Sequence, residues 1–178
     1  TSVSRGLGDV YKRQFLPQPE LMLVGQGRIA ELVAELGRLL HFRVTVNSPG
    51  ATREDFPFAD QLITDDTDYQ KINPGLNSYV IVLTQHKGDQ QVIQAALRGT
   101  PRYIGLVASA KRSRLVVEYL KEGGMDADAL RQVLRAPCGL DIGGRTPEEI
   151  ALSIITEVVK LRHERTGLSM MEVKQCSI

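Results

Sequence analysis

Short apolar runs alternate along this chain with longer segments in which apolar residues recur every three or four positions. The runs at residues 21–24, 79–83 and 103–107 have the length and composition of fully buried strands. Residues 43–48 are typical of a further strand, and residues 58–63 of a short strand or edge segment. Strands that alternate with helices favour a parallel sheet covered on both faces. We therefore predict an α/β fold, a three-layer Rossmann-like domain with a mostly parallel sheet of about five or six strands.

The segments between the strands have the period of amphipathic helices. The first predicted helix has an apolar side made of Ile29, Leu32, Val33, Leu36, Leu39 and Leu40. A later predicted helix has an apolar face made of Leu115, Val116, Tyr119 and Leu120. We expect these faces to pack against the sheet.

The clearest helix start lies near the C-terminal end of the chain. Thr146 is a natural N-cap, Pro147 suits the first helical position, and Glu149 completes a capping box. The pattern predicts a helix to about Arg165, with Glu157 on its wetter side. Residues 168–178 are predicted to be a loose tail.

A Gly-x-Gly-x-x-Ala turn connects the first strand to the first helix. Gly25 allows a sharp reversal, Gly27 allows the backbone to approach a phosphate, and Ala30 keeps the helix close to the sheet. Gln26 and Arg28 complete the candidate binding group, in which Arg28 could meet a phosphate at the helix N-terminus. The alternative is a structural turn that binds nothing.

The end of the second strand lacks the acid that NAD enzymes use to hold the ribose hydroxyls. Asn47 stands there instead, and an amide can still form a hydrogen bond with a hydroxyl, although without charge. This favours a nucleotide or dinucleotide-like ligand over a standard NAD dehydrogenase. Asn47 is a candidate contact for a ribose or a pterin, or only a turn residue.

Polar residues follow the other strands, where the loops of an open parallel sheet bind ligands. His86 could act as an acid or base near neutral pH, but a surface histidine is an equal alternative. Lys111 and Arg112 could equally lie on a solvated face. Gly143 and Gly144 could serve only a tight backbone path. The candidates are Thr84, Gln85, His86, Asp89, Ser109, Lys111, Arg112, Asp141, Gly143, Gly144 and Arg145.

Composition narrows the function classes. The chain has 178 residues and a net charge of +1, which gives no long-range preference for nucleic acid. Its two cysteines, Cys138 and Cys176, have no metal-ligand spacing, so we expect no metal site and a reducing cytoplasmic setting. Cys138 could carry sulfur, but a buried apolar cysteine is commoner. No apolar run is long enough for a membrane span.

Two other segments have polar patterns. Asp65, Asp66 and Asp68 lie close together but lack the glycine and closing glutamate of a calcium loop, so a solvated acidic loop is expected. Residues 1–14 are polar and aperiodic and resemble a non-native leader. The predicted organisation is therefore a leader at 1–14, a Rossmann domain at 15–167 and the tail.

Four motifs occur together in one order: the glycine turn, the loop at 84–89, Tyr-Ile-Gly-Leu-Val-Ala-Ser at 103–109, and Gly-Leu-Asp-Ile-Gly-Gly-Arg-Thr-Pro-Glu-Glu-Ile-Ala at 139–151. Together they resemble the Rossmann domain of the XdhC/CoxI family, the accessory factors of xanthine dehydrogenase and related molybdenum hydroxylases. The resemblance covers about residues 20–165. It implies a protein that binds molybdenum cofactor (molybdopterin or its cytosine dinucleotide form), assists its sulfuration with a cysteine desulfurase, and delivers it to the apoenzyme.

Several alternatives stay open. Family members often carry an additional N-terminal domain, so this chain could be a truncated form or could work with a separate partner. An NAD(P)-dependent oxidoreductase would use the same turn, but no Tyr-x-x-x-Lys pair is present. A regulatory nucleotide sensor is a third interpretation, and a homodimer is one option. We expect an accessory binding protein, with no catalytic residue assigned, no nucleic-acid partner and no membrane partner.

Overall fold

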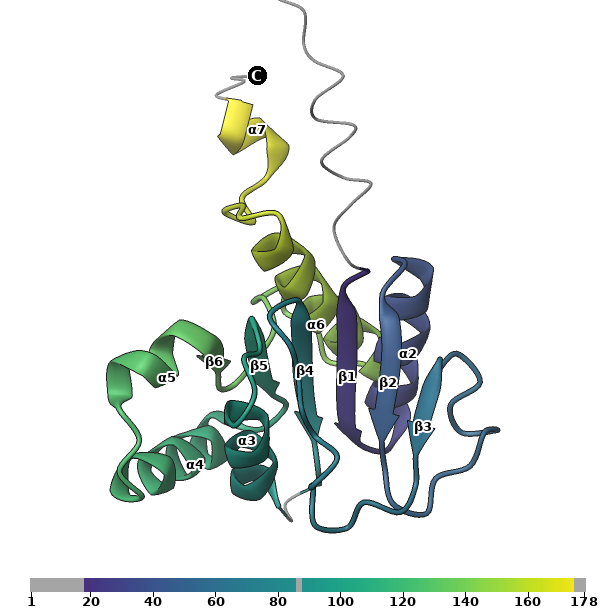
Figure 1. The fold of residues 1–178 in the computed structure, drawn as a ribbon. Coiled ribbons are helices and arrows are strands. Elements are labelled where there is room, and N and C mark those ends of the chain that lie inside the picture. Colours follow the sequence, from purple (N-terminus) through teal and green to yellow (C-terminus); the bar gives the residue numbers. More distant parts are fainter. Residues whose placement is uncertain (1–17, 86–87, 175–178) are drawn as a thin grey trace, which may run out of the picture.

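The computed structural model describes residues 18–85 and 88–174 and contains one twisted sheet with helices on both faces (Figure 1). Six parallel strands are arranged in the order β3-β2-β1-β4-β5-β6. This arrangement confirms the predicted three-layer α/β fold. The strands are β1 (Glu20–Gly25), β2 (Arg43–Asn47), β3 (Gln61–Ile63), β4 (Ser78–Leu83), β5 (Tyr103–Leu106) and β6 (Leu134–Arg135). The predicted leader at 1–14 lies outside the described residues.

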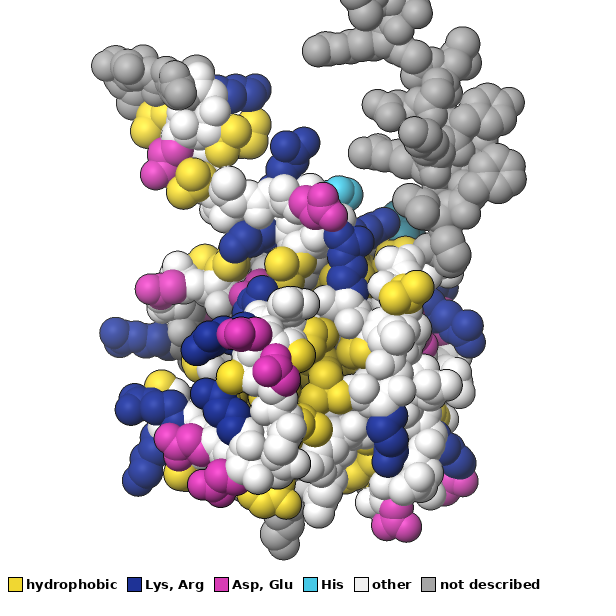
Figure 2. Space-filling view, turned by 60° about the vertical axis from the view of Figure 1, so that its left-hand side comes forward, with side chains coloured by type: hydrophobic (Ala, Val, Ile, Leu, Met, Phe, Trp, Pro, Cys, Tyr) yellow, Lys and Arg dark blue, Asp and Glu magenta, His cyan; other side chains and the backbone are white. Residues whose placement is uncertain are grey.

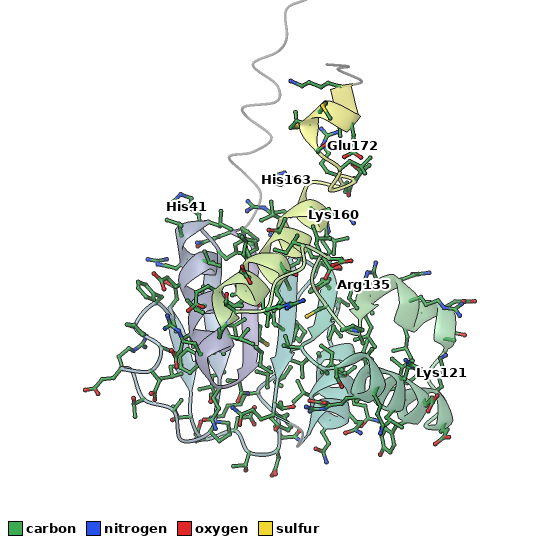
Figure 3. The ribbon with its side chains drawn as sticks, turned by 180° about the vertical axis from the view of Figure 1, so that it is seen from behind. His41, Lys121, Arg135, Lys160, His163 and Glu172 are labelled. Carbon is green, nitrogen blue, oxygen red and sulfur yellow. The ribbon has the colours of Figure 1, made fainter. Side chains whose placement is uncertain are left out.

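Helices α2 (Arg28–Leu39) and α6 (Pro147–Arg162) cover one face of the sheet and pack side by side (Figure 3). Helices α3 (Asp89–Leu97), α4 (Ala110–Glu122) and α5 (Ala127–Val133) lie on the other side. The short α7 (Met170–Lys174) projects away from the sheet. No helix in the described ranges is long and apolar enough to cross a membrane.

Strand β1 shows how one apolar run supplies two cores. Leu21 and Leu23 belong to the core beneath α2 and α6, whereas Met22 and Val24 belong to the core beneath α3 and α4. All four side chains are at most 5% exposed. Burial on both faces explains the continuous apolar run, because neither face of a central parallel strand meets water.

The predicted helix faces are partly wrong. Leu39 is 72% exposed at the end of α2. On α4 the buried stripe contains Ser113, Val116 and Leu120, while Leu115 and Tyr119 are more than half exposed. The sheet therefore contacts a stripe adjacent to the one that the apolar residues predicted.

Helix α6 begins as predicted but differs in its length and buried face. Thr146 and Glu149 form the predicted capping box, and the helix ends at Arg162, three residues before the predicted end. Glu157 was predicted on the wetter side, but it is only 9% exposed. Its carboxylate instead accepts hydrogen bonds beneath the helix, as described below.

The predicted loose tail also needs correction, because residues Met170–Lys174 form α7. No residue of this helix is buried. The described part of the tail therefore has local helical structure but contributes nothing to the core.

Candidate functional site

The candidate site lies where the connections of the sheet diverge. From β1 the chain proceeds outward through β2 and β3, and from β4 it proceeds in the opposite direction through β5 and β6. Gly25 at the end of β1 pairs with Leu83 at the end of β4. The carboxyl ends of these two strands define the switch point at which open parallel sheets bind ligands.

The two glycines of the turn have different structural roles. A Cβ atom on Gly25 would lie 2.3 Å from the carbonyl oxygen of Leu83, and the residue has a φ of +125°. Gly25 therefore lets β1 and β4 stay in contact as the chain turns. Gly27 has a φ of +105° and caps α2 without a side-chain hydrogen bond. The N–H groups of the first turn of α2 thus have no side-chain cap and suit an anion.

Two adjoining cavities open beside the turn and share Gln26 and Gln85. Gln85 has a left-handed φ of +40°, which is uncommon for a residue with a side chain. The larger cavity has a volume of about 290 Å³ and is lined by Gln26, Gly27, Glu31, Gly50, Ala51, Asp55, Phe56 and Gln85. The smaller has a volume of about 130 Å³ and is lined by Gly25, Gln26, Asn47, Ser48, Pro49, Tyr69, Leu83, Thr84 and Gln85.

Asn47 forms a hydrogen bond with Asp66, a residue that we predicted to be exposed to solvent. Its Nδ2 donates to Asp66 Oδ2 over 2.6 Å, and Asp66 also accepts from the backbone N–H groups of Gln70 and Lys71. Asp66 is only 4% exposed. The prediction of a solvated acidic loop is therefore wrong for Asp66, although Asp65 is exposed as expected.

The residues after β4 and β5 are connected to one another. The Thr84 hydroxyl donates to Asp89, and Asp89 is buried in an ion pair with Arg112. Ser109 caps α4 by accepting from the Arg112 N–H group. These contacts give Asp89 and Ser109 structural roles, whereas Thr84 also lines the smaller cavity. Lys111 is exposed, and His86 lies outside the described residues.

The two histidines that the structure describes lie far from the glycine turn. His41 and His163 are both at the end of the molecule opposite the carboxyl ends of the strands (Figure 3). Neither can serve as an acid or base at the two cavities. The described part of the site therefore has no histidine for proton transfer, and the described ranges contain no group of three or more metal-ligating side chains.

The N-terminus of α6 lies beside that of α2. Arg28 forms ion pairs with Glu31 at 3.3 Å and with Glu148 at 3.4 Å, and both contacts are exposed. Exposed pairs of this kind contribute little to stability. Arg28 therefore lies at the mouth of the site with its charge partly compensated.

The loop before α6 already uses its donors internally. Glu149 accepts from the N–H groups of Arg145 and Thr146, and these bonds lower the pKa of the carboxyl. Asp141 accepts from the N–H group of Gly143 over 3.4 Å. The loop, which includes Gly144, lies near the turn through the Arg28 contact. Its N–H groups are nevertheless less available to a ligand than those of α2.

Cys138 lies apart from the cavities, between β5 and α6. Burial, together with the nearby Glu157 carboxylate, raises the pKa of its thiol to about 12. Burial likewise raises the pKa of Tyr103 well above its ordinary value. A thiol with this pKa is almost wholly protonated near neutral pH and is a poor nucleophile.

Several residues that line the cavities were not predicted from the sequence. Gly50, Ala51, Asp55 and Phe56 come from the segment after β2, and Tyr69 comes from the loop after β3. Burial raises the pKa of the Tyr69 hydroxyl, with smaller effects from Asp89 and Asp66. The available signal was position, since both segments follow the carboxyl ends of strands.

Charged side chains of both signs are mixed on one face of the domain. Basic and acidic side chains are interspersed on the face shown in Figure 2, without a stripe of one sign among its described residues. This pattern agrees with the balanced composition.

The strand order and the glycine turn after β1 define a Rossmann-type domain. The profile of the XdhC Rossmann domain matches residues 21–158, and the chain belongs to this family. The resemblance of its sequence motifs to this domain is thereby confirmed.

Three similar proteins support this assignment. The chain is 30% identical over 164 residues to a Bacillus subtilis 168 protein described as a probable xanthine dehydrogenase subunit, covering 86% of this chain and 46% of that protein. It is 26% identical over 163 residues to the uncharacterized protein YqeB of Escherichia coli K12, covering 87% and 29% respectively. A solved structure described as a xanthine dehydrogenase of Bacillus halodurans superposes with a TM-score of 0.72 at 26% identity, covering 84% of this chain and 46% of that one. The chain thus spans less than half of each relative's length.

Proposed function

We propose that this domain binds the molybdenum cofactor at the glycine turn and serves in the maturation of a molybdenum hydroxylase of the xanthine dehydrogenase or carbon monoxide dehydrogenase type. The observation that carries the proposal is the N-terminus of α2, which has no side-chain cap and adjoins the larger cavity. The membership in the XdhC family and the names of two relatives support the choice of cofactor and client.

The residues present fit the phosphate part of such a cofactor. Backbone N–H groups at Gly27 and in the first turn of α2 would hold the phosphate or pyrophosphate, since the helix dipole favours negative charge there. The two adjoining cavities, about 290 and 130 Å³, have room for a pterin or nucleotide part on either side of Gln26 and Gln85. The cofactor itself would supply the molybdenum chemistry to the client enzyme.

The sulfuration step would need a partner. Cys138 is a poor sulfur carrier because the pKa of its thiol is about 12. We therefore assign the sulfur-transfer cysteine to a separate cysteine desulfurase, while this chain holds the cofactor and delivers it to the apoenzyme. This role belongs in the cytoplasm and requires no catalytic residue in the domain.

The second candidate function is an NAD(P)-dependent oxidoreductase. Its supporting observation is the strand order with a glycine turn after β1, which suits a dinucleotide as well as it suits a cofactor phosphate. Substrate turnover would then need an acid or base other than His41 and His163, which lie at the opposite end of the molecule.

Anaerobic titration of the purified chain with molybdenum cofactor, NAD, NADP and ATP tests these functions. The Gly27→Leu variant places a side chain at the turn, and Gly124→Leu is a matched control. Gly124 also has a positive φ, of +89°, but it follows α4 and has no neighbouring atom within 4 Å of a built Cβ. Circular dichroism would verify that both variants are folded.

We expect the molybdenum cofactor to bind most tightly, with affinity reduced at least tenfold in Gly27→Leu and unchanged in Gly124→Leu. Preference for NAD or NADP with the same dependence on Gly27 would favour the oxidoreductase. Binding that ignores the Gly27 substitution would refute this placement of the ligand.

A further inference from the structure

Helix α7 and the residues before it display an apolar surface that the domain does not cover. Leu168, Met170, Met171 and Val173 are each more than half exposed, and no residue of the helix is buried. The helix projects away from the sheet beyond the end of α6 (Figure 1). A group of neighbouring exposed apolar side chains, unlike a single one, is a sign of an interaction surface.

A local cap, rather than packing, holds α7 in its helical form. The Ser169 N–H group and hydroxyl donate to Glu172 Oε2 over 2.9 and 2.6 Å, and the Glu172 N–H group donates to the Ser169 hydroxyl over 3.2 Å. Isolated helices of this length are marginal in water. The cap therefore lowers the cost of ordering the segment when a partner binds it.

An apolar groove elsewhere on the domain suits such a segment. It lies between α4, α5 and β6, and its volume is about 180 Å³. Leu130 and Leu134 in its wall are at most 8% exposed and belong to the core, so the groove is a firm surface. The lining residues are Val117, Lys121, Ala127, Leu130, Arg131, Leu134 and Ala136.

The charges at the groove complement those of α7. Lys121 has no hydrogen bond or ion pair within the described ranges, and Arg131 has only an exposed, weak ion pair with Asp128. These two cations suit the carboxylate of Glu172, whose Oε1 accepts no hydrogen bond from any described residue. Lys174 on α7 and Asp128 beside the groove are a second pair of opposite charges.

We propose that α7 docks into the groove between α4 and α5 of a second copy of this chain, so that two copies exchange their helices and form a symmetric dimer. Within one chain the two surfaces lie far apart, because Glu172 stands beyond the end of α6 and Lys121 lies at the other end of the domain (Figure 3). A second copy supplies both complementary surfaces, and a reciprocal exchange covers both helices and closes the assembly. Neither surface lines the two cavities beside the glycine turn.

Sedimentation equilibrium of the purified chain, with a reductant present, measures the association. Met170→Ser/Met171→Ser removes apolar side chains from α7, and Leu152→Ser is the matched control because Leu152 is 50% exposed on α6. Ala127→Gln fills the groove with a polar side chain. Ala129→Gln is its control, since Ala129 is exposed on the same helix and does not line the groove. Circular dichroism would verify that each variant is folded.

We expect a reversible dimer that dissociates on dilution from about 200 to about 2 μM, because small interfaces bind weakly. The double serine variant, Ala127→Gln and the charge reversal Lys121→Glu should each weaken the dimer about tenfold or more. Leu152→Ser, Ala129→Gln and the conservative Lys121→Arg should stay within about twofold of the parent.

A mixture of two variants tests whether the contact is made between copies. The double serine variant keeps an intact groove, and Ala127→Gln keeps an intact α7. Adding unlabelled Ala127→Gln to the isotope-labelled double serine variant should shift the NMR amide signals of residues around the groove, such as Lys121 and Arg131. Exchanging the label should move the shifts to α7.

Three results would overturn the proposal. The first is a chain that stays monomeric at about 200 μM. The second is a dimer whose affinity ignores either the α7 variant or the groove variant. The third is a groove whose NMR signals differ between the parent and the double serine variant at every concentration, since α7 would then dock within its own chain. The measurements contain no ligand, so each of these results leaves the proposed function at the glycine turn untouched.

Discussion

The buried carboxylate of Glu157 should be a principal support of the segment that connects β6 to α6. One oxygen, Oε2, accepts from the Tyr103 hydroxyl over 2.5 Å and from the Gly139 N–H group over 2.8 Å. Tyr103 is 1% exposed, so its hydroxyl cannot replace this bond with water in the folded protein. Gly139 is only partly buried and can recruit water.

The substitution Glu157→Ala would leave the buried Tyr103 hydroxyl with only the Cys138 thiol, a weak acceptor, beside it. A buried donor without a good acceptor costs roughly 1–3 kcal/mol, and the lost bond to Gly139 adds about 1 kcal/mol. We therefore expect Glu157→Ala to lower the free energy of unfolding by about 3 kcal/mol. Glu157→Gln keeps a carbonyl oxygen that can accept both bonds, so it should cost only about 1 kcal/mol.

Urea unfolding followed by circular dichroism measures these differences by linear extrapolation. Glu148→Ala on the same helix is the control, because its ion pair with Arg28 is exposed and should be worth less than about 0.5 kcal/mol. Adding Tyr103→Phe to Glu157→Ala removes the poorly paired hydroxyl and should recover part of the lost stability. Stability of Glu157→Ala within about 0.5 kcal/mol of the parent would refute the reasoning.

Three further predictions concern the turn, the thiol and the capping box. Gly25→Ala should destabilise the fold by about 3–5 kcal/mol, because its Cβ would clash with the backbone of Leu83, and an unchanged urea midpoint would contradict this. The Cys176→Ser background leaves Cys138 as the thiol to be tested. Since folding raises the pKa of the Cys138 thiol from 9.0 to about 12, iodoacetamide at about pH 8 should alkylate it about a thousandfold more slowly in the folded than in the urea-unfolded chain. Equal alkylation rates in the two states would contradict this prediction. The lowered pKa of Glu149 means that its contribution to stability is present above the ordinary pKa of 4.5 and is lost as the pH falls through the lower folded value. Glu149→Gln should therefore lower the urea midpoint at neutral pH and converge with the parent in strong acid, and a difference that persists there would count against this cap.

Much of the fold could be predicted because its central strands are buried on both faces. Residues 21–24 and 79–83 are apolar without interruption, which is the pattern of such strands. The sixth strand, Leu134–Arg135, has only two residues and no apolar run to reveal it. Helix faces were less certain because neighbouring stripes differ by one residue, so Ser113 is buried while Leu115 is exposed.

The site was predictable where a local pattern determines it. The glycine turn can be recognised from a motif of six residues, and the strand order places this turn at the switch point of the sheet as expected. Contacts between distant residues leave no such pattern. Asp66 pairs with Asn47 across 19 positions and Glu157 with Tyr103 across 54, so each acid looked like a solvated side chain.

The adjacency of β1 and β4 has a consequence for how the domain forms. Glu20 and Ser78 are neighbours in the sheet although 58 positions separate them. Pairing of these strands must therefore wait until a long intervening segment has been closed into a loop, which is slow compared with local helix formation. The cavities exist only after that step, so a ligand that occupies them binds the completed fold alone. At a concentration one hundred times its dissociation constant, such a ligand would stabilise the whole domain by about 2.7 kcal/mol, and its presence during synthesis would favour completion of folding.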